Sequence, residues 1–268
     1  MFQFKITDSE FSLFRTFIYD HVGINLSDEK KTLVSSRLGK RLRHYSLGSF
    51  QEYFDLIVAS SHDGERQIAI DLLTTNETYF FREPKHFEFL KKEVLPKWKG
   101  VNTFKVWSAA SSTGEEAYSI AMLLDDLLGH RPWEIFGSDI SRRVLKTAQQ
   151  GHYLQARIDG IPKAYLRKYC LKGVGEHEGT LLVNKKLRER VVFSPVNLKK
   201  LPKDLGFFDI IFLRNVLIYF DMKTKIHIIK QLMEKMHPES YLFIGHSESL
   251  KGIHDGLVTV IPTVYRKT

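Results

Sequence analysis

The sequence contains almost no cysteine and no long hydrophobic run. Cys170 is the only cysteine among 268 residues, so the sequence excludes an internal disulfide and a thiolate metal cluster within one chain. The apolar run 207–220 is interrupted by Asp209, Arg214 and Asn215, and no segment approaches the roughly 18 to 20 apolar residues of a membrane span. A membrane-spanning class is therefore excluded, and a reducing compartment is expected.

The sequence also lacks a secretion signal, internal repeats and low-complexity tracts. Its N-terminus, MFQFKITDSEF, has no basic region followed by an apolar stretch and a small-residue cleavage site. Hydrophobic residues make up 43% of the chain and charged residues 26%, which is typical of an ordinary folded protein. We therefore expect a folded protein that stays in the cytoplasm.

Acidic residues are fewer than basic ones. There are 31 Asp and Glu against 40 Lys and Arg, a formal net charge of +9. This excess predicts an anionic partner, and nucleic acid, anionic lipid and an acidic protein surface all fit it. Residues 28–45 hold six Lys and Arg and two acids. Lys30, Arg37, Arg41 and His44 share one stripe of a predicted helix there, which is either a solvated face or a docking face for an acidic partner.

Two patterns divide the chain. Residues 1–75 are predicted to form helices, with capping boxes at Thr7 and Glu10 and at Ser49 and Glu52. From about residue 100, apolar runs alternate with helical segments, which indicates a mostly parallel sheet. We expect strands at 104–109, 133–138, 208–213, 241–245 and 257–265, and helices at 113–128 and 222–236.

This alternation breaks at about residues 160–195. GVGEHEG has the composition of a loop, and TLLVNKKLRERVVF is typical of two short strands joined by a turn. We predict an inserted β element there. The expected organisation is a helical domain at 1–75, a linker and first helix at 76–100, and a cofactor domain at 101–268 that carries the insertion.

The segment VWSAASSTGEEAYSIAML predicts a strand, a turn of small residues and a helix opened by a capping box from Ser112 to Glu115. Gly114 is its only glycine, and Glu115 and Glu116 would repel a pyrophosphate, so the pattern favours a cofactor without phosphates. Asp139 ends the next strand, where such folds bind ribose hydroxyls. A nucleoside carrying a positive group, such as S-adenosylmethionine, fits both facts. An ordinary capped helix and an Asp at a turn is the alternative.

Two other segments place polar side chains near the same crevice. FFDIIFLRNVLIYF has the continuous apolar pattern of a buried strand, and polar residues at the carboxyl ends of such strands line the ligand crevice. TTNETYFFREP connects the two domains and ends in Pro84, which suits the first position of a helix. The polar residues are Arg214, Asn215 and Tyr219 from the first segment, and Asn76, Thr78 and Arg82 from the second.

In order and spacing, the segments TTNETYFFRE, VWSAASSTGEEAYSIAM, GSDIS, NLKK, FLRNVLIYFD and GHSESL resemble the chemotaxis receptor glutamate methyltransferases, the CheR family. The resemblance covers essentially the whole chain. It implies a Rossmann-like α/β methyltransferase domain with a small antiparallel β-subdomain insertion, preceded by an all-α N-terminal domain. It also implies methyl transfer from S-adenosylmethionine to glutamates of methyl-accepting chemotaxis receptors, which gives glutamate methyl esters and S-adenosylhomocysteine.

The resemblance also implies roles for individual residues. Arg82 and Tyr219 match positions beside the transferred methyl. The matches to cofactor-contacting positions are Asn76, Thr78, Arg82, Glu116, Asp139, Asn197, Leu198, Arg214 and Asn215. In the family, the β insertion binds a C-terminal peptide of some receptors, and the basic helix faces the receptor's methylation region. We expect a cytoplasmic monomer recruited to membrane-bound receptor arrays, without a metal, nucleic acid or direct membrane insertion.

Other functions match fewer features. Base-modifying methyltransferases typically follow an Asn or Asp with Pro-Pro and an aromatic residue, whereas Asn215 is followed by Val216 and Leu217. GHSES, at 245–249, resembles a nucleophile elbow, but the final Gly is missing and only 19 residues remain to supply an Asp and a His. A methyltransferase for another acidic protein and a non-catalytic receptor-binding module remain alternatives. The scattered histidines, His177 and His246 among them, show no paired zinc-ligand spacing.

Overall fold

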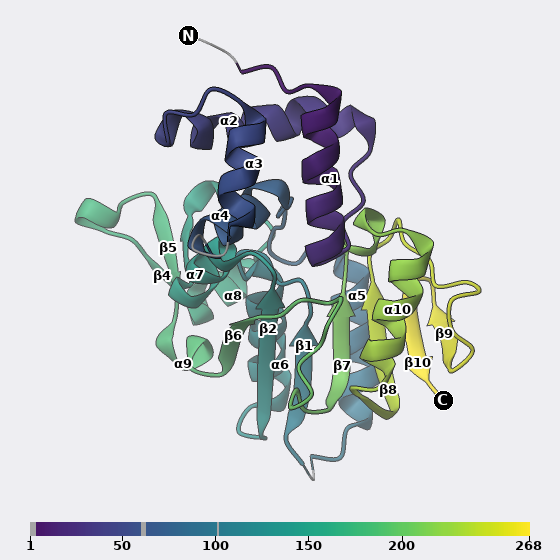
Figure 1. The fold of residues 1–268 in the computed structure, drawn as a ribbon. Coiled ribbons are helices and arrows are strands. Elements are labelled where there is room, and N and C mark those ends of the chain that lie inside the picture. Colours follow the sequence, from purple (N-terminus) through teal and green to yellow (C-terminus); the bar gives the residue numbers. More distant parts are fainter. Residues whose placement is uncertain (1–3, 60–62, 101) are drawn as a thin grey trace.

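The N-terminal part of the chain is a bundle of helices (Figure 1). A computed structural model describes residues 4–59, 63–100 and 102–268. The helices are α1 (Asp8–Val22), η1 (Asp28–Lys30), α2 (Lys31–His44), α3 (Phe50–Val58) and α4 (Asp63–Leu73). The predicted capping box of Thr7 and Glu10 is confirmed, and α1 ends at Gly23, whose φ of 87° suits glycine.

A seven-stranded sheet forms the centre of the rest of the chain. Its strands are β1 (Phe104–Ser108), β2 (Trp133–Asp139), β6 (Val191–Pro195), β7 (Phe208–Leu213), β8 (Met236–Ile244), β9 (Leu257–Ile261) and β10 (Val264–Lys267). Their order is β6-β2-β1-β7-β8-β10-β9, and the first five run parallel. The α/β fold class and the preceding all-α domain are confirmed.

Helices cover both faces of this sheet. They are α5 (Pro84–Phe89), followed by η3 (Leu90–Val94) and η4 (Leu95–Lys97), then α6 (Glu115–Leu128), α7 (Arg142–Gln150) and α10 (Met222–Met233), with the short turn η7 (Leu217–Tyr219) before α10. Alternate residues of β7 enter different cores: Ile210 and Phe212 pack with α5 and α6, whereas Ile211 and Leu213 pack with α10. The α10 core continues into the interior of the N-terminal helices, so the two domains share one apolar cluster.

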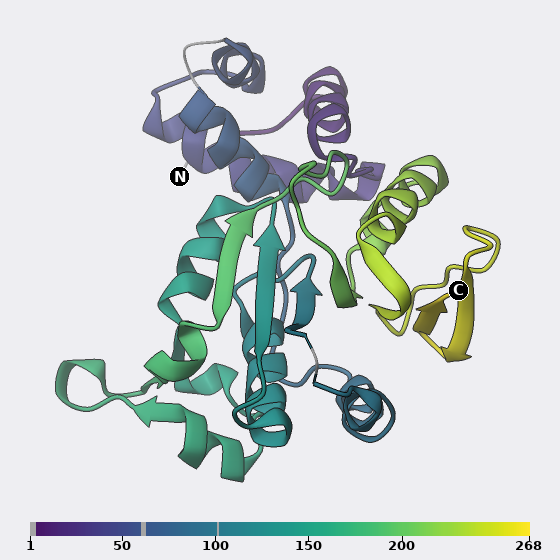
Figure 2. The same ribbon diagram turned by 90° about the horizontal axis from the view of Figure 1, so that it is seen from below.

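The predicted β insertion exists, but its expected bounds of about 160–195 are wrong at both ends. The small sheet has the order β3-β5-β4 and consists of β3 (His152–Leu154), β4 (Cys170–Lys172) and β5 (Thr180–Val183), all antiparallel. The connecting elements are η5 (Gln155–Arg157), α8 (Lys163–Tyr169), η6 (Gly175–His177) and α9 (Lys185–Arg188). Figures 1 and 2 show it projecting on the side opposite the C-terminal hairpin.

Residues 191–195 belong to the main sheet as its edge strand β6, paired with β2. Phe193 decides this placement. Its ring lies over Gly137 of β2, where an added Cβ would come within 2.4 Å of it. The sequence pattern alone does not distinguish this long-range pairing from a local hairpin.

Two other local expectations are wrong. The expected last strand at 257–265 is a hairpin of β9 and β10, with Thr263 at a φ of 68° in the turn. Ser112 does not cap α6, because Gly114 is the N-cap and the Ser112 hydroxyl donates to the carbonyl of Asn76 instead. In the part of the chain that the structure describes, no helix has the length and apolar character of a membrane span.

The end of α1 is fastened to the sheet domain by polar contacts. Asn25 N donates to the carbonyl of Tyr219 at 2.8 Å, and the Tyr19 hydroxyl donates to Asp221 at 2.7 Å. Lys199 Nζ donates to the last carbonyls of α1, as suits a cation at a helix C-terminus. In Figure 2 the N-terminal helices lie beyond the arrowheads of β2 and β6, so they cover the carboxyl end of the sheet.

Candidate active site

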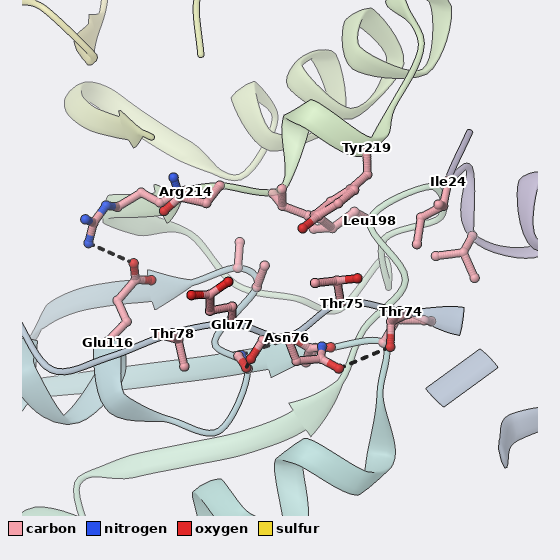
Figure 3. Close-up of a pocket in the computed structure, with 18 of the residues that line it drawn as sticks. Ile24, Thr74, Thr75, Asn76, Glu77, Thr78, Glu116, Leu198, Arg214 and Tyr219 are labelled. Atoms are coloured by element: carbon pink, nitrogen blue, oxygen red, sulfur yellow. Dashed lines mark hydrogen bonds and ion pairs between the residues drawn. The ribbon is translucent and has the colours of Figure 1, made fainter. Parts of the chain in front are cut away.

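A cavity lies where the N-terminal helices meet the carboxyl ends of the central strands (Figure 3). The strand order reverses at β1, because β2 lies on one side of it and β7 on the other. Open α/β sheets bind ligands at this switch point. The lining includes Val22, Ile24, Thr74–Thr78, Arg82, Ser112, Glu116, Asp139, Val196, Leu198, Arg214–Val216, Tyr219 and Phe220.

Arg214 and Glu116 form a buried ion pair at one side of this cavity, drawn dashed in Figure 3. The Arg214 Nη1 to Glu116 Oε2 distance is 3.1 Å, and Ser108 donates to the other oxygen of Glu116 at 2.6 Å. Burial raises the pKa of Glu116, against the opposing effect of Arg214. Arg214 is also 3.0 Å from Glu83, so one guanidinium joins two carboxylates from separate segments.

Asp139 stands at the carboxyl end of β2, as predicted. Its two oxygens accept from Ser112 N at 3.0 Å and Ser141 N at 2.9 Å. Burial raises the pKa of Asp139 to about 6, although these two hydrogen bonds oppose the rise. The carboxyl therefore changes charge close to physiological pH.

Backbone strain is concentrated around this cavity. Among the described residues, seven other than glycine have a positive φ, and four of them lie here: Phe81, Glu83, Ser112 and Asn215. Phe81 and Glu83 flank Arg82, whose side chain donates to the carbonyl of Glu77 at 3.0 Å. Such conformations cost about 1 to 3 kcal/mol each and persist only where the surroundings enforce them.

Tyr219 enters the cavity across from the linker residues Glu77 and Thr78 (Figure 3). It belongs to the short turn η7, and its ring is half-buried. Burial raises the pKa of Tyr219, so its hydroxyl keeps its proton at neutral pH. It can therefore act as a hydrogen-bond donor to a ligand.

Part of the cavity wall is apolar. Ile24, Val196 and Leu198 form it, from the end of α1 and the loop after β6. Asn197 does not line the cavity, contrary to expectation. Its side chain donates to the carbonyl of His21 at 2.7 Å and therefore fastens α1.

Comparison with known proteins identifies the family. Residues 9–74 match the CheR methyltransferase all-alpha domain, and residues 76–265 match the CheR methyltransferase SAM-binding domain. The chain belongs to the CheR methyltransferase family.

Curated relatives agree along nearly the full chain. A protein named chemotaxis protein methyltransferase from Escherichia coli (strain K12) is 40% identical, over 97% of this chain and 91% of its own length. Chemotaxis protein methyltransferase 2 of Pseudomonas aeruginosa is 38% identical, over 98% and 94%. The chemotaxis protein methyltransferase of Borreliella burgdorferi is 38% identical, over 98% and 95%.

The cavity of this CheR-family chain suits S-adenosylmethionine chemically. Asp139 offers a carboxylate for hydroxyl donors, and Glu116 offers one for a cationic group. Ile24 and Leu198 offer an apolar surface for a base. The sequence missed Val22 and Ile24 as lining residues, because the end of α1 reaches the site only through the packing of the two domains.

Two of the four residues predicted to form a docking face, Arg37 and Arg41, are also held by contacts inside the helical domain. Arg41 makes a bidentate ion pair with Glu65, at 2.7 and 2.6 Å, and the hydroxyls of Tyr45 and Tyr53 donate to the same carboxylate. Arg37 is half-buried and donates to the carbonyls of Leu72, in the last turn of α4, and Thr74, just after it. Arg41 is paired inside the domain because α4 buries an acid, Glu65, that needs a cation.

Lys30 and His44 are exposed. A docking role for Lys30, Arg37, Arg41 and His44 stays a prediction. The Arg37 guanidinium has its pKa lowered by burial and by the neighbouring charge of Arg143.

One group of potential metal-ligand atoms occurs among the described residues. Glu83, His86 and His246 bring such atoms within 4.8 Å of one another. Both oxygens of Glu83 already accept hydrogen bonds, one from Arg214 and the other from Asn215 and His246 N. Arg214 therefore already balances the charge of Glu83 within the protein.

Proposed function

We propose that the protein is a protein-glutamate O-methyltransferase that modifies methyl-accepting chemotaxis receptors. The observation that carries the proposal is one cavity in a CheR-family chain that holds acids at two strand ends together with Arg82 and Tyr219. The relatives' names supply the chemotaxis context. The products are glutamate methyl esters and S-adenosylhomocysteine.

The proposed cofactor contacts follow the chemistry of the cavity wall. Asp139 accepts from the ribose hydroxyls, Leu198 packs against the adenine, and Glu116 with Arg214 faces the amino-acid end. Asn76 and Thr78 belong to the interdomain linker, and Figure 3 draws them along one wall. The remaining proposed contacts are Arg82 and Asn215.

S-adenosylmethionine supplies a methyl group that its sulfonium activates. When a glutamate carboxylate oxygen bonds to this methyl, the bond from methyl to sulfur breaks and S-adenosylhomocysteine is the second product. A glutamate side chain with a pKa of about 4.3 is already an anion at neutral pH, so the protein needs no general base. Its work is to align the carboxylate and to remove water from it. We assign orientation of the carboxylate to Arg82 and a hydrogen bond near the methyl to Tyr219.

The substrate is an acidic helix bundle of the receptor's cytoplasmic part, so the enzyme works in the cytoplasm, as a monomer recruited to receptor arrays. The residues on or beside α2 that would attract such a surface are Lys30, Arg37, Arg41 and His44. The small sheet is the proposed site for a receptor's C-terminal peptide. Its edge strand β4 is free on one side, and Leu171 and Val174 nearby are exposed.

The decisive experiment is transfer of a labelled methyl group to membranes rich in chemoreceptors. We expect the label to leave as methanol in mild base, because an ester hydrolyses. Label that resists mild base would contradict glutamate modification, and calorimetry that detects no S-adenosylmethionine binding would favour the non-catalytic module. Receptors with alanine at the modified glutamates are the control.

A further inference from the structure

The carboxylate of Glu248 lies where two loops at the carboxyl edge of the sheet meet. Its Oε2 accepts from Gly245 N at 2.6 Å and from Asn215 N at 3.0 Å, and its Oε1 accepts from Ile218 N at 3.3 Å. The side chain is buried, and no basic side chain within the described residues forms an ion pair with it. Main-chain N–H groups therefore stabilise its charge.

The two loops touch so closely that only glycine fits at 245. A Cβ there would lie 2.5 Å from Asn215 Nδ2 and 2.8 Å from both Asn215 N and Glu248 Oε2. Asn215 itself is left-handed, with a φ of 56°. Its side-chain amide donates to Glu83 at 3.2 Å. Two carboxylates thus hold Asn215, Glu248 by its main chain and Glu83 by its side chain.

Asn215 lies just before η7, and Ile218 lies within it. The hydrogen bonds of this turn run from Tyr219 N to Val216 O and from Phe220 N to Leu217 O, so N–H groups before them have no partner within the turn. Glu248 accepts from two of these groups. This segment carries the cavity-lining residues Arg214, Asn215 and Tyr219. Its main chain is held by hydrogen bonds to Glu248, which belongs to another loop.

We propose that Glu248 is a positioning residue, which holds the segment 214–219 in the shape that presents Asn215 to the cofactor and Tyr219 to the transferred methyl. The inference rests on the proposed function of this cavity. It assigns a role to the GHSESL segment other than that of a nucleophile elbow. Glutamine replaces Glu248 only in part: its one acceptor oxygen can keep the bonds to Gly245 N and Asn215 N, but the negative charge is lost and its NH2 would face the Ile218 N–H.

The test is Glu248→Gln, with Ser247→Ala as the matched control from the same loop, where Ser247 is exposed. Loss of charge-assisted hydrogen bonds should weaken S-adenosylhomocysteine binding, and lower the single-turnover rate, by about tenfold or more at a temperature where the variant is folded. KM for the receptor should not change. Glu248→Asp, which keeps the acceptors on a shorter side chain, should recover part of the loss.

Affinity and rate equal to wild type in folded Glu248→Gln would overturn the proposal, even if the melting temperature fell. If that variant does not fold, Gly245→Ala tests the contact between Glu248 and Asn215. The new Cβ would displace Asn215, whereas the Glu248 side chain keeps its carboxylate. Wild-type affinity and rate in Gly245→Ala would equally overturn it. A failure of the proposed function is distinguishable, since the wild-type protein would then bind no S-adenosylhomocysteine or transfer no methyl.

Discussion

At the residue scale, Arg214 organises the site through its neighbours. It contacts Glu83, Glu116 and the carbonyl of Arg82, and its side chain is 2% exposed. Burial alone would raise the pKa of Glu83, but Arg214 and the hydrogen bonds from His246 N and Asn215 together lower it. The carboxylate beside Arg82 therefore stays ionised and keeps the guanidinium of Arg214 in place.

The proposed roles of Arg82 and Tyr219 predict slower chemistry in two variants. Tyr219→Phe and Arg82→Ala should each lower kcat by about ten- to a hundredfold, since each loses an interaction with the reacting groups. Single-turnover assays with receptor membranes measure this. Tyr79→Phe is the control. The Arg82 guanidinium lies over the Tyr79 ring, and this substitution removes a hydroxyl but keeps the ring. If both site variants retain the wild-type kcat, the assigned roles are wrong.

Asp139 predicts a pH dependence of cofactor binding. Its raised pKa of about 6 means that the carboxyl is protonated in the free protein at lower pH. Hydroxyl donors bind the carboxylate better than the acid, so affinity for S-adenosylhomocysteine should rise as pH increases through 6 and then level off. Calorimetry across this range measures it. In Asp139→Asn the step should vanish, and an unchanged step there would assign the dependence to another group.

At the scale of elements, α2 combines structure and charge. Val34, Leu38 and Leu42 are fully buried along one side. Arg41 neutralises Glu65 of α4, whose side chain is 3% exposed. One of the basic residues of α2 is therefore there to pair with the buried Glu65 of α4.

This pairing predicts the stability of two variants. Arg41→Ala leaves Glu65 buried without a cation and should lower the free energy of unfolding by about 3 kcal/mol. Lys40→Ala, at the exposed neighbouring position, should change it little. Denaturant titration measures both. Equal stability of the two variants would mean that the hydroxyls of Tyr45 and Tyr53 suffice to hold the carboxylate.

At the scale of the whole molecule, the helical domain closes one side of the cavity. Ile24 forms a bridge to Phe220, and Gly23 lies against Thr224 of α10 with no room for a Cβ. The same domain carries the basic stretch 28–45, which has six Lys and Arg and two acids, although residues 1–75 as a whole hold about as many acids as bases. Cofactor enclosure and the proposed receptor docking therefore depend on one rigid unit.

The charge predicts a salt-dependent interaction with the receptor. KM for receptor should rise with ionic strength, because exposed charges are screened beyond about 8 to 10 Å, while affinity for S-adenosylhomocysteine changes little. The double variant Lys30→Glu, His44→Glu should raise KM in the same way. Lys99→Glu is the control, since Lys99 is exposed and precedes β1, at the amino end of the sheet and away from the helical domain. A receptor KM that is indifferent to salt and to charge reversal would contradict docking through α2.

The sequence by itself determined the class of fold and most of the site. The helical spacing of apolar residues and the capping box predict α1, because helix hydrogen bonds are local. Continuous apolar runs predict the parallel strands, because these strands are buried on both faces. Asp139 and Arg214 were predicted because strand ends share one edge of a sheet, whereas Glu116, in the first turn of α6, was assigned through the family resemblance.

Only the tertiary structure decided which residues meet across long distances. It placed β6 in the main sheet, paired Arg41 with Glu65, turned Asn197 toward α1 and brought Glu248 to Asn215. A carboxylate in a sequence does not reveal its partner, because the partner is chosen by burial and geometry between distant segments. Chemistry at strand ends is therefore predictable from order along the chain, whereas the contacts that support it depend on packing.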